Sequence, residues 1–322
     1  ALACGVRGRV FESRRGCSRE RITPLPFYDK KIGVTPPMTK VKVITDSTAY
    51  LPDTIQKKYN IAVIPLTLIW NDETYLDGVD ITPSQFYQRL LNSDTLPSTS
   101  QPSIEAFKKV FRQHVHTGHD IIAILISSRI SGTVESALQA KQDMGTDRIA
   151  IVDSRTSGMA MGLQVLSVAE SASRGDNLSQ CESLAERVRE KTQVYFAVDT
   201  LEFLHRGGRI GGAKRFLGTM LDIKPILEMR EGQIEAVDQV RTQRRASARI
   251  IQLMEDTIGR NQNLRLAVMH SNAPQRAQAL LDQARDKFNP LEAYLADLSP
   301  VIGTHVGPGT LALAAMPSNK PS

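Results

Sequence analysis

Short apolar runs alternate with longer segments in which apolar side chains recur at helical spacing, from Val41 onward. Apolar runs bounded by turn residues predict strands, which we place at residues 41–45, 61–70, 121–126, 149–152, 194–198, 264–270 and 291–298. Helical spacing after capping or proline residues predicts helices, which we place at about 52–59, from 82, from 103, and at 131–144, 157–173, 178–191, 243–258 and 274–288. Such alternation is typical of a mostly parallel sheet with helices on both faces.

Two places depart from this alternation. Pro65 interrupts the apolar run at 61–70, which indicates an edge strand or a break in the strand. Residues 230–232 (Arg-Glu-Gly) separate two strand-like runs at 225–229 and 233–237, as in a hairpin. The later part of the chain therefore contains antiparallel pairing.

These patterns predict an α/β fold of two domains, and 322 residues suffice for two domains of ordinary size. We expect a mostly parallel sheet in the first domain, and a mixed or antiparallel sheet with helices in the second. The predicted boundaries are a disordered or non-native extension at 1–37, domains at 38–185 and 186–317, and a tail at 318–322.

Most of the net positive charge lies in the first 37 residues, which hold eight Lys and Arg against three acidic residues, +5 of the net +6. The rest of the chain is nearly neutral, so we expect no binding to nucleic acid and disfavour a DNA-binding regulator. The first residues show no sustained period. Met38, directly before a predicted strand, is a candidate true start.

Cysteine and histidine usage indicates neither disulfides nor a metal. The chain has three cysteines and no zinc-ligand spacing, which favours a reducing cytoplasm. His114, His116 and His119 cluster beside a glycine, where we expect a solvated turn. No apolar run approaches the roughly 20 residues that cross a bilayer.

Two hydroxyl-rich motifs are the leading candidates for a binding site. TSQPS spans Thr99–Ser103, and SSRISGT spans Ser127–Thr133 directly after the strand at 121–126. Strand ends and helix starts present free N–H groups at one sheet edge, which suits a carboxylate or phosphate. Each motif could also be only a capped helix start.

Five further residues could join this site, each with a competing structural role. His305 lies beside a glycine-rich turn, and His270 follows a strand. Arg206 and Arg209 flank Gly207-Gly208, where a helical segment breaks before restarting near residue 212. Asp46 follows the first strand and could cap a helix or orient a hydroxyl. Neither GxGxxG after a strand nor GxxxxGK[ST] is present, so no motif supports nucleotide binding.

A serine hydrolase with Ser128, His305 and Asp153 as its triad is the alternative function. The chain lacks the G-x-S-x-G elbow that many such enzymes use. Triads are nevertheless defined by geometry, so the alternative stays open at this point.

Taken together, these motifs resemble the DegV family, fatty-acid-binding proteins that include the acyl-carrying subunit of bacterial fatty acid kinase. The resemblance covers about residues 40–313. It rests on ITDSTAYLP, IPL, TSQPS, SSRISGT, VDSRTSGMAMG, DTLEFLHRGGRI, KPIL and THVGPGTL. TSQPS, SSxxSGT and HxGPGT in this order are specific as a set.

The resemblance implies two α/β domains with a long-chain fatty acid, such as hexadecanoate, between them. Thr99 and Ser128 would hold its carboxylate, with Ser131, Gly132 and His305 close by. The protein would be a bacterial cytoplasmic binder without a cofactor or enzymatic activity of its own. It would present the acid to an ATP-dependent kinase subunit, which forms acyl phosphate for phospholipid synthesis.

Two further expectations follow from that role. Arg206 and Arg209 are candidates for contact with the kinase, because the chain has no phosphate-binding loop. Exchange of the lipid would also allow peripheral contact with a membrane.

Overall fold

The computed structural model describes residues 40–218, 223–259 and 263–318. The predicted extension at 1–37, and the predicted tail apart from Ser318, lie outside the described residues. We call residues 40–192 the N-terminal half and residues 193–318 the C-terminal half. The predicted domain division near residue 185 stays a prediction.

The N-terminal half contains a four-stranded parallel sheet in the order β2-β1-β6-β7. Its strands are β1 (Val41–Asp46), β2 (Ala62–Ile64), β6 (Asp120–Leu125) and β7 (Ile149–Asp153). Because the strands are parallel, the turns after β1, β6 and β7 lie at one edge of the sheet. Those turns carry Asp46, SSRISGT and Ser154, as the sequence pattern predicts.

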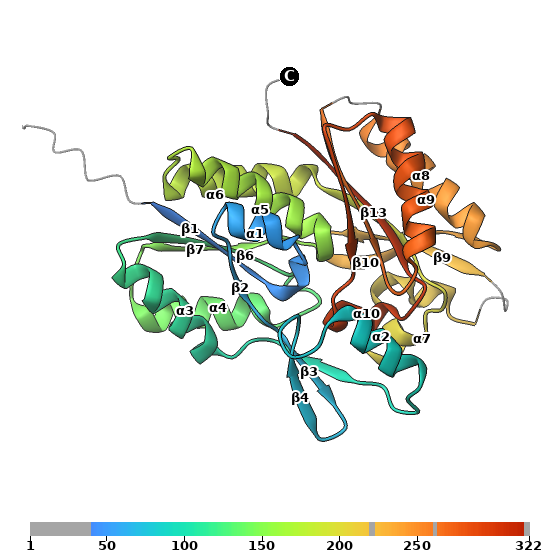
Figure 1. Cartoon of the computed structure of the whole chain (residues 1–322), viewed down its shortest axis with the longest axis horizontal. Coiled ribbons are helices and arrows are strands. Elements are labelled where there is room, and N and C mark those ends of the chain that lie inside the picture. The colour runs from blue at the N-terminus through green and yellow to red at the C-terminus, as the bar shows by residue number, and fades with distance from the viewer. Residues whose placement is uncertain (1–39, 219–222, 260–262, 319–322) are drawn as a thin grey trace, which may run out of the picture. The chain divides into compact units, whose positions relative to one another are not determined.

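Helices cover both faces of this sheet (Figure 1). The helices α3 (Ile104–His116) and α4 (Thr133–Met144) pack on one face, and α5 (Gly158–Ser173) and α6 (Leu178–Lys191) pack on the other. The short helix α1 (Asp53–Lys58) lies near α5 in Figure 1. Helix α5 is buried nearly all round, because it contacts β1 and β6 of this sheet and also β11 and β13 of the next.

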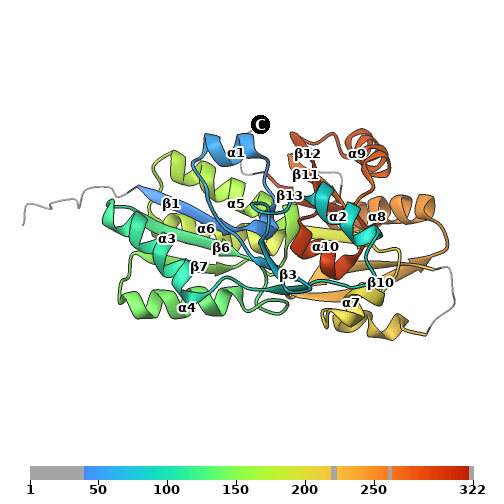
Figure 2. The same cartoon turned by 60° about the horizontal axis from the view of Figure 1, so that its bottom comes forward.

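The C-terminal half contains a mixed six-stranded sheet in the order β10-β9-β8-β13-β11-β12. Its strands are β8 (Gln193–Ala197), β9 (Lys224–Arg230), β10 (Gln233–Val240), β11 (Leu264–His270), β12 (Glu292–Asp297) and β13 (Leu311–Pro317). Only β11 and β12 pair in parallel; the other pairs are antiparallel. Helices α8 (Gln243–Ile258) and α9 (Pro274–Phe288) cover one face, and the other faces α5 (Figure 2).

The predicted strand at 61–70 is two strands in two sheets. It breaks at Pro65, so that β2 joins the parallel sheet and β3 (Thr67–Trp70) lies in a separate sheet ordered β4-β3-β5. The neighbours of β3 are β4 (Glu73–Leu76) and β5 (Ser98–Ser100), and α2 (Pro83–Leu91) lies between them in the chain. The sequence pattern did not predict β5, because a run of Ser-Thr-Ser has no apolar signal.

Two elements near the end of the described chain were also not predicted. Helix α10 (Pro300–Val306) begins at Ser299, whose hydroxyl accepts from the Ile302 N–H at 3.3 Å. Strand β13 follows the glycine-rich turn and lies between β8 and β11. By contrast, the break at Gly207-Gly208 is confirmed, since α7 (Glu202–Arg206) ends there and a 3-10 helix follows at Gly211–Phe216.

Candidate fatty acid site

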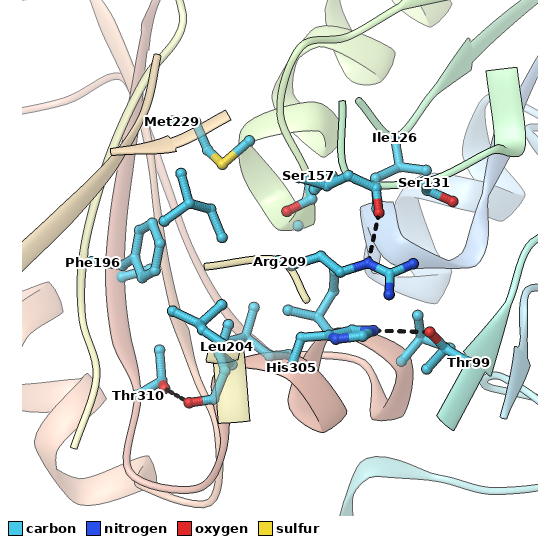
Figure 3. A pocket seen from close by; sticks show the side chains of 18 of the residues that line it. Thr99, Ile126, Ser131, Ser157, Phe196, Leu204, Arg209, Met229, His305 and Thr310 are labelled. Atoms are coloured by element: carbon cyan, nitrogen blue, oxygen red, sulfur yellow. Dashed lines mark hydrogen bonds between the residues drawn. The ribbon is translucent and has the colours of Figure 1, made fainter. Parts of the chain in front are cut away.

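A cavity lies between the two large sheets, and the two halves line it differently. The N-terminal half contributes mainly polar side chains: Thr99, Ser100, Gln101, Ser131 and Ser157. The C-terminal half contributes mainly apolar ones, among them Val194, Phe196, Leu204, Met229, Met269 and Ile302. Figure 3 shows Phe196 and Met229 on the side of the cavity opposite Thr99 and His305. The cavity therefore has one polar end and apolar walls.

The polar end joins the two halves through Thr99 and His305. Thr99 Oγ1 and His305 Nε2 share a hydrogen bond of 2.8 Å (Figure 3). Strand β5 fixes Thr99 by pairing it with Leu68, and α10 carries His305 in its last turn. Thr99 and His305 are 206 residues apart in the chain, so only the tertiary fold brings them together.

His305 is uncharged at neutral pH in this site. Burial, and then the positive charge of Arg209, lower the pKa of the imidazole from 6.5 to about 4. Its Nδ1 is buried without a hydrogen-bond partner among the described residues. A Cβ atom at Gly207 would lie 2.3 Å from that Nδ1, so residue 207 must be glycine for the ring to keep this position.

The two arginines of the glycine-rich segment occupy different environments. Arg209 lines the cavity, donating from Nε to the Ile130 carbonyl at 3.1 Å and from Nη1 to the Gly207 carbonyl at 2.7 Å. Arg206 is 61% exposed and pairs with Glu202 at 2.7 Å. Of the two arginines that the sequence offered for the site, Arg209 lies at the polar end of the cavity, whereas Arg206 is on the surface.

TSQPS and SSRISGT contact each other at this end of the cavity. Gln101 packs against Gly132, where an added Cβ would lie 3.0 Å from the amide nitrogen. Ser131 lines the cavity, and its hydroxyl shares a hydrogen bond of 2.8 Å with Thr133. The helix after SSRISGT begins at Thr133 rather than at Ser131, with Gly132 as its N-cap.

Ser128 lies apart from the other predicted ligand residues. It is exposed, and its hydroxyl donates to Asp153 Oδ2 at 2.5 Å. It is not among the described residues that line the cavity. Ser128 therefore contacts the carboxylate of Asp153 directly, and His305 contacts Thr99. In a hydrolase triad the histidine would instead lie between the serine and the aspartate.

Asp46 has the capping role that the sequence pattern suggested. Its Oδ1 accepts from the Thr48 N–H at 2.9 Å, and its Oδ2 accepts from the Ile126 N–H at 2.7 Å. Burial raises the pKa of this carboxyl to about 6. The second contact fixes the start of SSRISGT, so Asp46 supports the site without lining the cavity.

The described residues offer neither a metal site nor a membrane-spanning helix. No group of three or more His, Cys, Asp or Glu side chains there could hold a metal ion. No described helix is long and apolar enough to cross a membrane. His270 is buried with its Nδ1 3.5 Å from Asp297 Oδ1, and it is not among the described residues that line the cavity.

Comparison with known proteins decides the family. The model of a family described as "Uncharacterised protein, DegV family" matches residues 40–318. The chain belongs to the DegV family. A DegV domain-containing protein of Clostridium perfringens is 36% identical over 279 residues, which cover 85% of this chain and 98% of that protein.

Solved DegV structures share the fold. A DegV family protein from Thermus thermophilus, described as binding fatty acid, is 33% identical with a TM-score of 0.83. DegV of Bacillus subtilis, described as a fatty acid binding protein, is 32% identical with a TM-score of 0.79. Each similarity covers 87% of this chain and 100% of the other.

The DegV motifs did not reveal every residue of the cavity. Phe196, Met229 and Met269 lie in strands or next to them, and in sequence they look like ordinary core residues. Nothing in the sequence separates a cavity wall from a core. Gly207 was visible only as a helix break, although its lack of a side chain is what admits the His305 ring.

Proposed function

We propose that this chain binds a long-chain fatty acid, such as hexadecanoate, with its carboxylate at the Thr99–His305 end of the cavity. The observation that carries the proposal is a cavity with apolar walls that ends at a hydroxyl, an imidazole and a guanidinium. The two DegV relatives described as fatty-acid-binding proteins share this fold over nearly all of their length.

Burial of the acyl chain supplies most of the affinity in this proposal. Each buried CH₂ contributes about 0.8 kcal/mol, before the cost of ordering the chain. The flexible side chains of Met229 and Met269 line the apolar wall and can adjust to the shape of a bound chain.

The carboxylate contacts are proposed from the positions of the polar side chains. Thr99 and Ser131 would donate from their hydroxyls, and Arg209 would supply positive charge. His305 would donate from Nε2 once a carboxylate replaces Thr99 as its partner. Ser128 could join only after its hydroxyl leaves Asp153, and Gly132 would allow close approach of the backbone.

Native mass spectrometry of the purified chain, followed by denaturing lipid extraction, tests the binding. We expect one fatty acid per chain. Calorimetry with hexadecanoate should then show that Thr99→Val weakens binding by about 1–3 kcal/mol, as for loss of a hydrogen bond to a charged group. Thr117→Val, on the surface and outside the cavity, is the matched control. Wild-type affinity in Thr99→Val together with Ser131→Ala would contradict this assignment of the carboxylate end.

The finer proposal is that a separate ATP-dependent kinase phosphorylates the bound acid. The chain lacks a phosphate-binding loop motif, so the phosphoryl-transfer groups would come from that partner. Arg206 is exposed beside the polar end, where an acidic surface of the kinase could pair with it. A cytoplasmic location, contact with a membrane for lipid exchange and a role in phospholipid synthesis belong to this proposal.

Arg206→Ala separates the kinase role from lipid binding. Hexadecanoate affinity should stay at the wild-type value, whereas kinase-dependent formation of acyl phosphate should fall. Arg209→Ala should reduce both, because Arg209 lines the cavity. Equal loss of both activities in Arg206→Ala, or loss of neither, would exclude a partner-specific role for Arg206.

A further inference from the structure

A second cavity, of about 320 Å³, lies behind the apolar wall of the first. Val194 and Met229 line both cavities, and the neighbouring residues Thr156 and Ser157 line one each. The lining of this second cavity is polar, with hydroxyl, amide, guanidinium and carboxylate groups. Its volume exceeds the space that one buried water needs and reaches the lower range of small-molecule sites.

Two buried polar atoms in this cavity lack a partner among the described residues. They are the Thr156 hydroxyl oxygen and the Gln164 amide oxygen, Oε1. Thr156 is 5% exposed and Gln164 is 1% exposed. Because Gln164 donates from Nε2 to the Ser154 carbonyl at 3.3 Å, its Oε1 is held in place and requires a donor. Buried polar atoms without partners are costly, so their presence on one cavity indicates an occupant with hydrogen-bonding groups.

The charges around the cavity indicate that this occupant is neutral. Three arginines and three glutamates line it, and they pair with one another. Arg155 contacts Glu231 at 2.9 Å and Glu190 at 3.4 Å, and Arg230 pairs with the buried Glu228. Neither sign of charge is left in excess, and therefore an ionic ligand gains little here.

We propose that this second cavity binds a small neutral polyhydroxyl molecule, a polyol or a sugar. A ligand hydroxyl can donate to Gln164 Oε1, and another can accept from or donate to Thr156. Ser154, Thr192 and Thr257 also line the cavity, and their hydroxyls donate to the carbonyls of Thr156, Val188 and Leu253. The proposal does not depend on fatty acid binding, because it concerns a separate cavity and separate atoms.

The ligand would connect the two halves of the molecule. Thr156 and Gln164 belong to the N-terminal half, and Glu228 and Arg230 belong to β9 of the C-terminal half. Close by, the Ser127 hydroxyl donates to the Gly232 carbonyl at 2.8 Å across the same boundary. A ligand that contacts both halves stabilises the folded chain in proportion to its occupancy.

The test is titration of the full chain with glycerol and with myo-inositol, followed by saturation-transfer NMR and by melting temperature. Inorganic phosphate is the charged comparator. At least one of the two polyols should bind saturably and raise the melting temperature, and phosphate should do neither. Thr156→Val should weaken polyol binding roughly three- to tenfold, as for one lost hydrogen bond. Its own melting temperature should not fall, since the hydroxyl it loses has no protein partner.

Two further variants complete the test. Gln164→Met keeps the side-chain length, removes the amide oxygen and should weaken binding to a similar degree. Thr45→Val is the control, because Thr45 is buried in β1 and its hydroxyl bonds to Ile124 outside this cavity. Absence of saturable binding by either polyol would mean that the cavity holds ordered water only, and would overturn the proposal. Tighter binding of phosphate than of both polyols, or equal polyol binding in wild type, Thr156→Val and Gln164→Met, would overturn it as well. Hexadecanoate binding, measured separately, is not expected to depend on these outcomes.

Discussion

The two halves of the molecule make different contributions to the cavity between the two large sheets. The N-terminal half supplies hydroxyl and amide side chains from turns and a short edge strand, and the C-terminal half supplies an apolar sheet face. The division is not complete. Arg209, His305 and Thr310 are polar lining residues of the C-terminal half, and Leu66, Ile126 and Ile130 are apolar ones of the N-terminal half. In the proposed function, recognition of the head group and burial of the tail fall mainly to different halves, and neither half alone can form the cavity.

The largest expected effect is a loss of folding stability when the buried ion pairs of Arg265, one of which links the two halves, are removed. Arg265 on β11 is 1% exposed and contacts Glu170 of α5 at 2.6 Å and Glu292 of β12 at 2.7 Å. Arg265→Met leaves these carboxylates without their buried cation, and should lower the free energy of unfolding by about 3–5 kcal/mol. Urea unfolding measures this, with the exposed pair variant Arg206→Met as the control. An equally small change in the free energy of unfolding in both variants would show that the ion pairs of Arg265 do not hold the halves together.

The pH dependence of stability should differ in sign between the halves. His305 has its pKa lowered to about 4, so the unfolded chain takes up its proton first as pH falls below about 6.5. This removes up to about 3 kcal/mol by pH 4. Asp46 and Asp77 in the N-terminal half have pKa values raised to about 6, so their ionisation lowers stability as pH rises from about 4 to 6.

The variant His305→Asn tests whether His305 and the two aspartates change stability in opposite directions as pH falls. It should lose less stability than wild type between pH 7 and pH 4.5, because only the acidic groups still titrate abnormally. Chemical unfolding at several pH values in that window provides the measurement. Parallel stability profiles for the two proteins would refute the assignment of a neutral, buried His305.

A methyl group at residue 207 should disturb the polar end without touching the ligand. In Gly207→Ala the new Cβ would overlap His305 Nδ1, and the ring would have to leave Thr99. We expect hexadecanoate binding to weaken by about 1–3 kcal/mol, the usual cost of overpacking. Gly208→Ala is the control, since no atom lies within 4 Å of its added Cβ and its φ of +70° affects folding only. Equal affinities for the two variants would contradict the account.

The smallest expected effect is a change in chain-length preference when the apolar end of the cavity is enlarged. Met229→Ala should enlarge the apolar end and shift preference toward longer acids by about 0.8 kcal/mol per added CH₂. Thr99→Val should instead weaken acids of all lengths equally, because it removes only a contact to the carboxylate. Competition binding with acids of fourteen to twenty carbons distinguishes the two patterns. A uniform loss in Met229→Ala would place that residue away from the end of the tail.

The sequence predicted the polar contributions better than the apolar ones. Hydroxyl-rich turns after buried strands are readable, which is why Thr99 and Ser131 were candidates before the structure was known. The carboxylate-holding role of Ser128 came from the resemblance, and its contact with Asp153 depends on tertiary geometry that the motif does not encode. The apolar wall was unpredictable, because residues such as Phe196 have the same pattern whether they line a cavity or fill a core.

The sequence pattern does not predict α10 and β13, for a related reason. Glycine and proline around residues 307–309 dominated the local signal, and the small residues of LALAA after them are weak strand formers. The helix and the strand are stabilised by their neighbours instead. Gly303 of α10, for example, packs so closely on Tyr87 that an added Cβ would lie 2.5 Å from the tyrosine oxygen. Contacts of this kind are invisible in a single sequence.

The inner position of β13 determines when the protein can complete its folding. Until residues 311–317 have been synthesised, β8 and β11 lack the strand that lies between them, and their facing backbone groups stay unpaired. The parallel sheet and the helices that cover its two faces end at Lys191, so they can form during synthesis. The polar end of the cavity is completed later, because Arg209 and His305 belong to the C-terminal half, and the cavity closes only after Ala312 has been added.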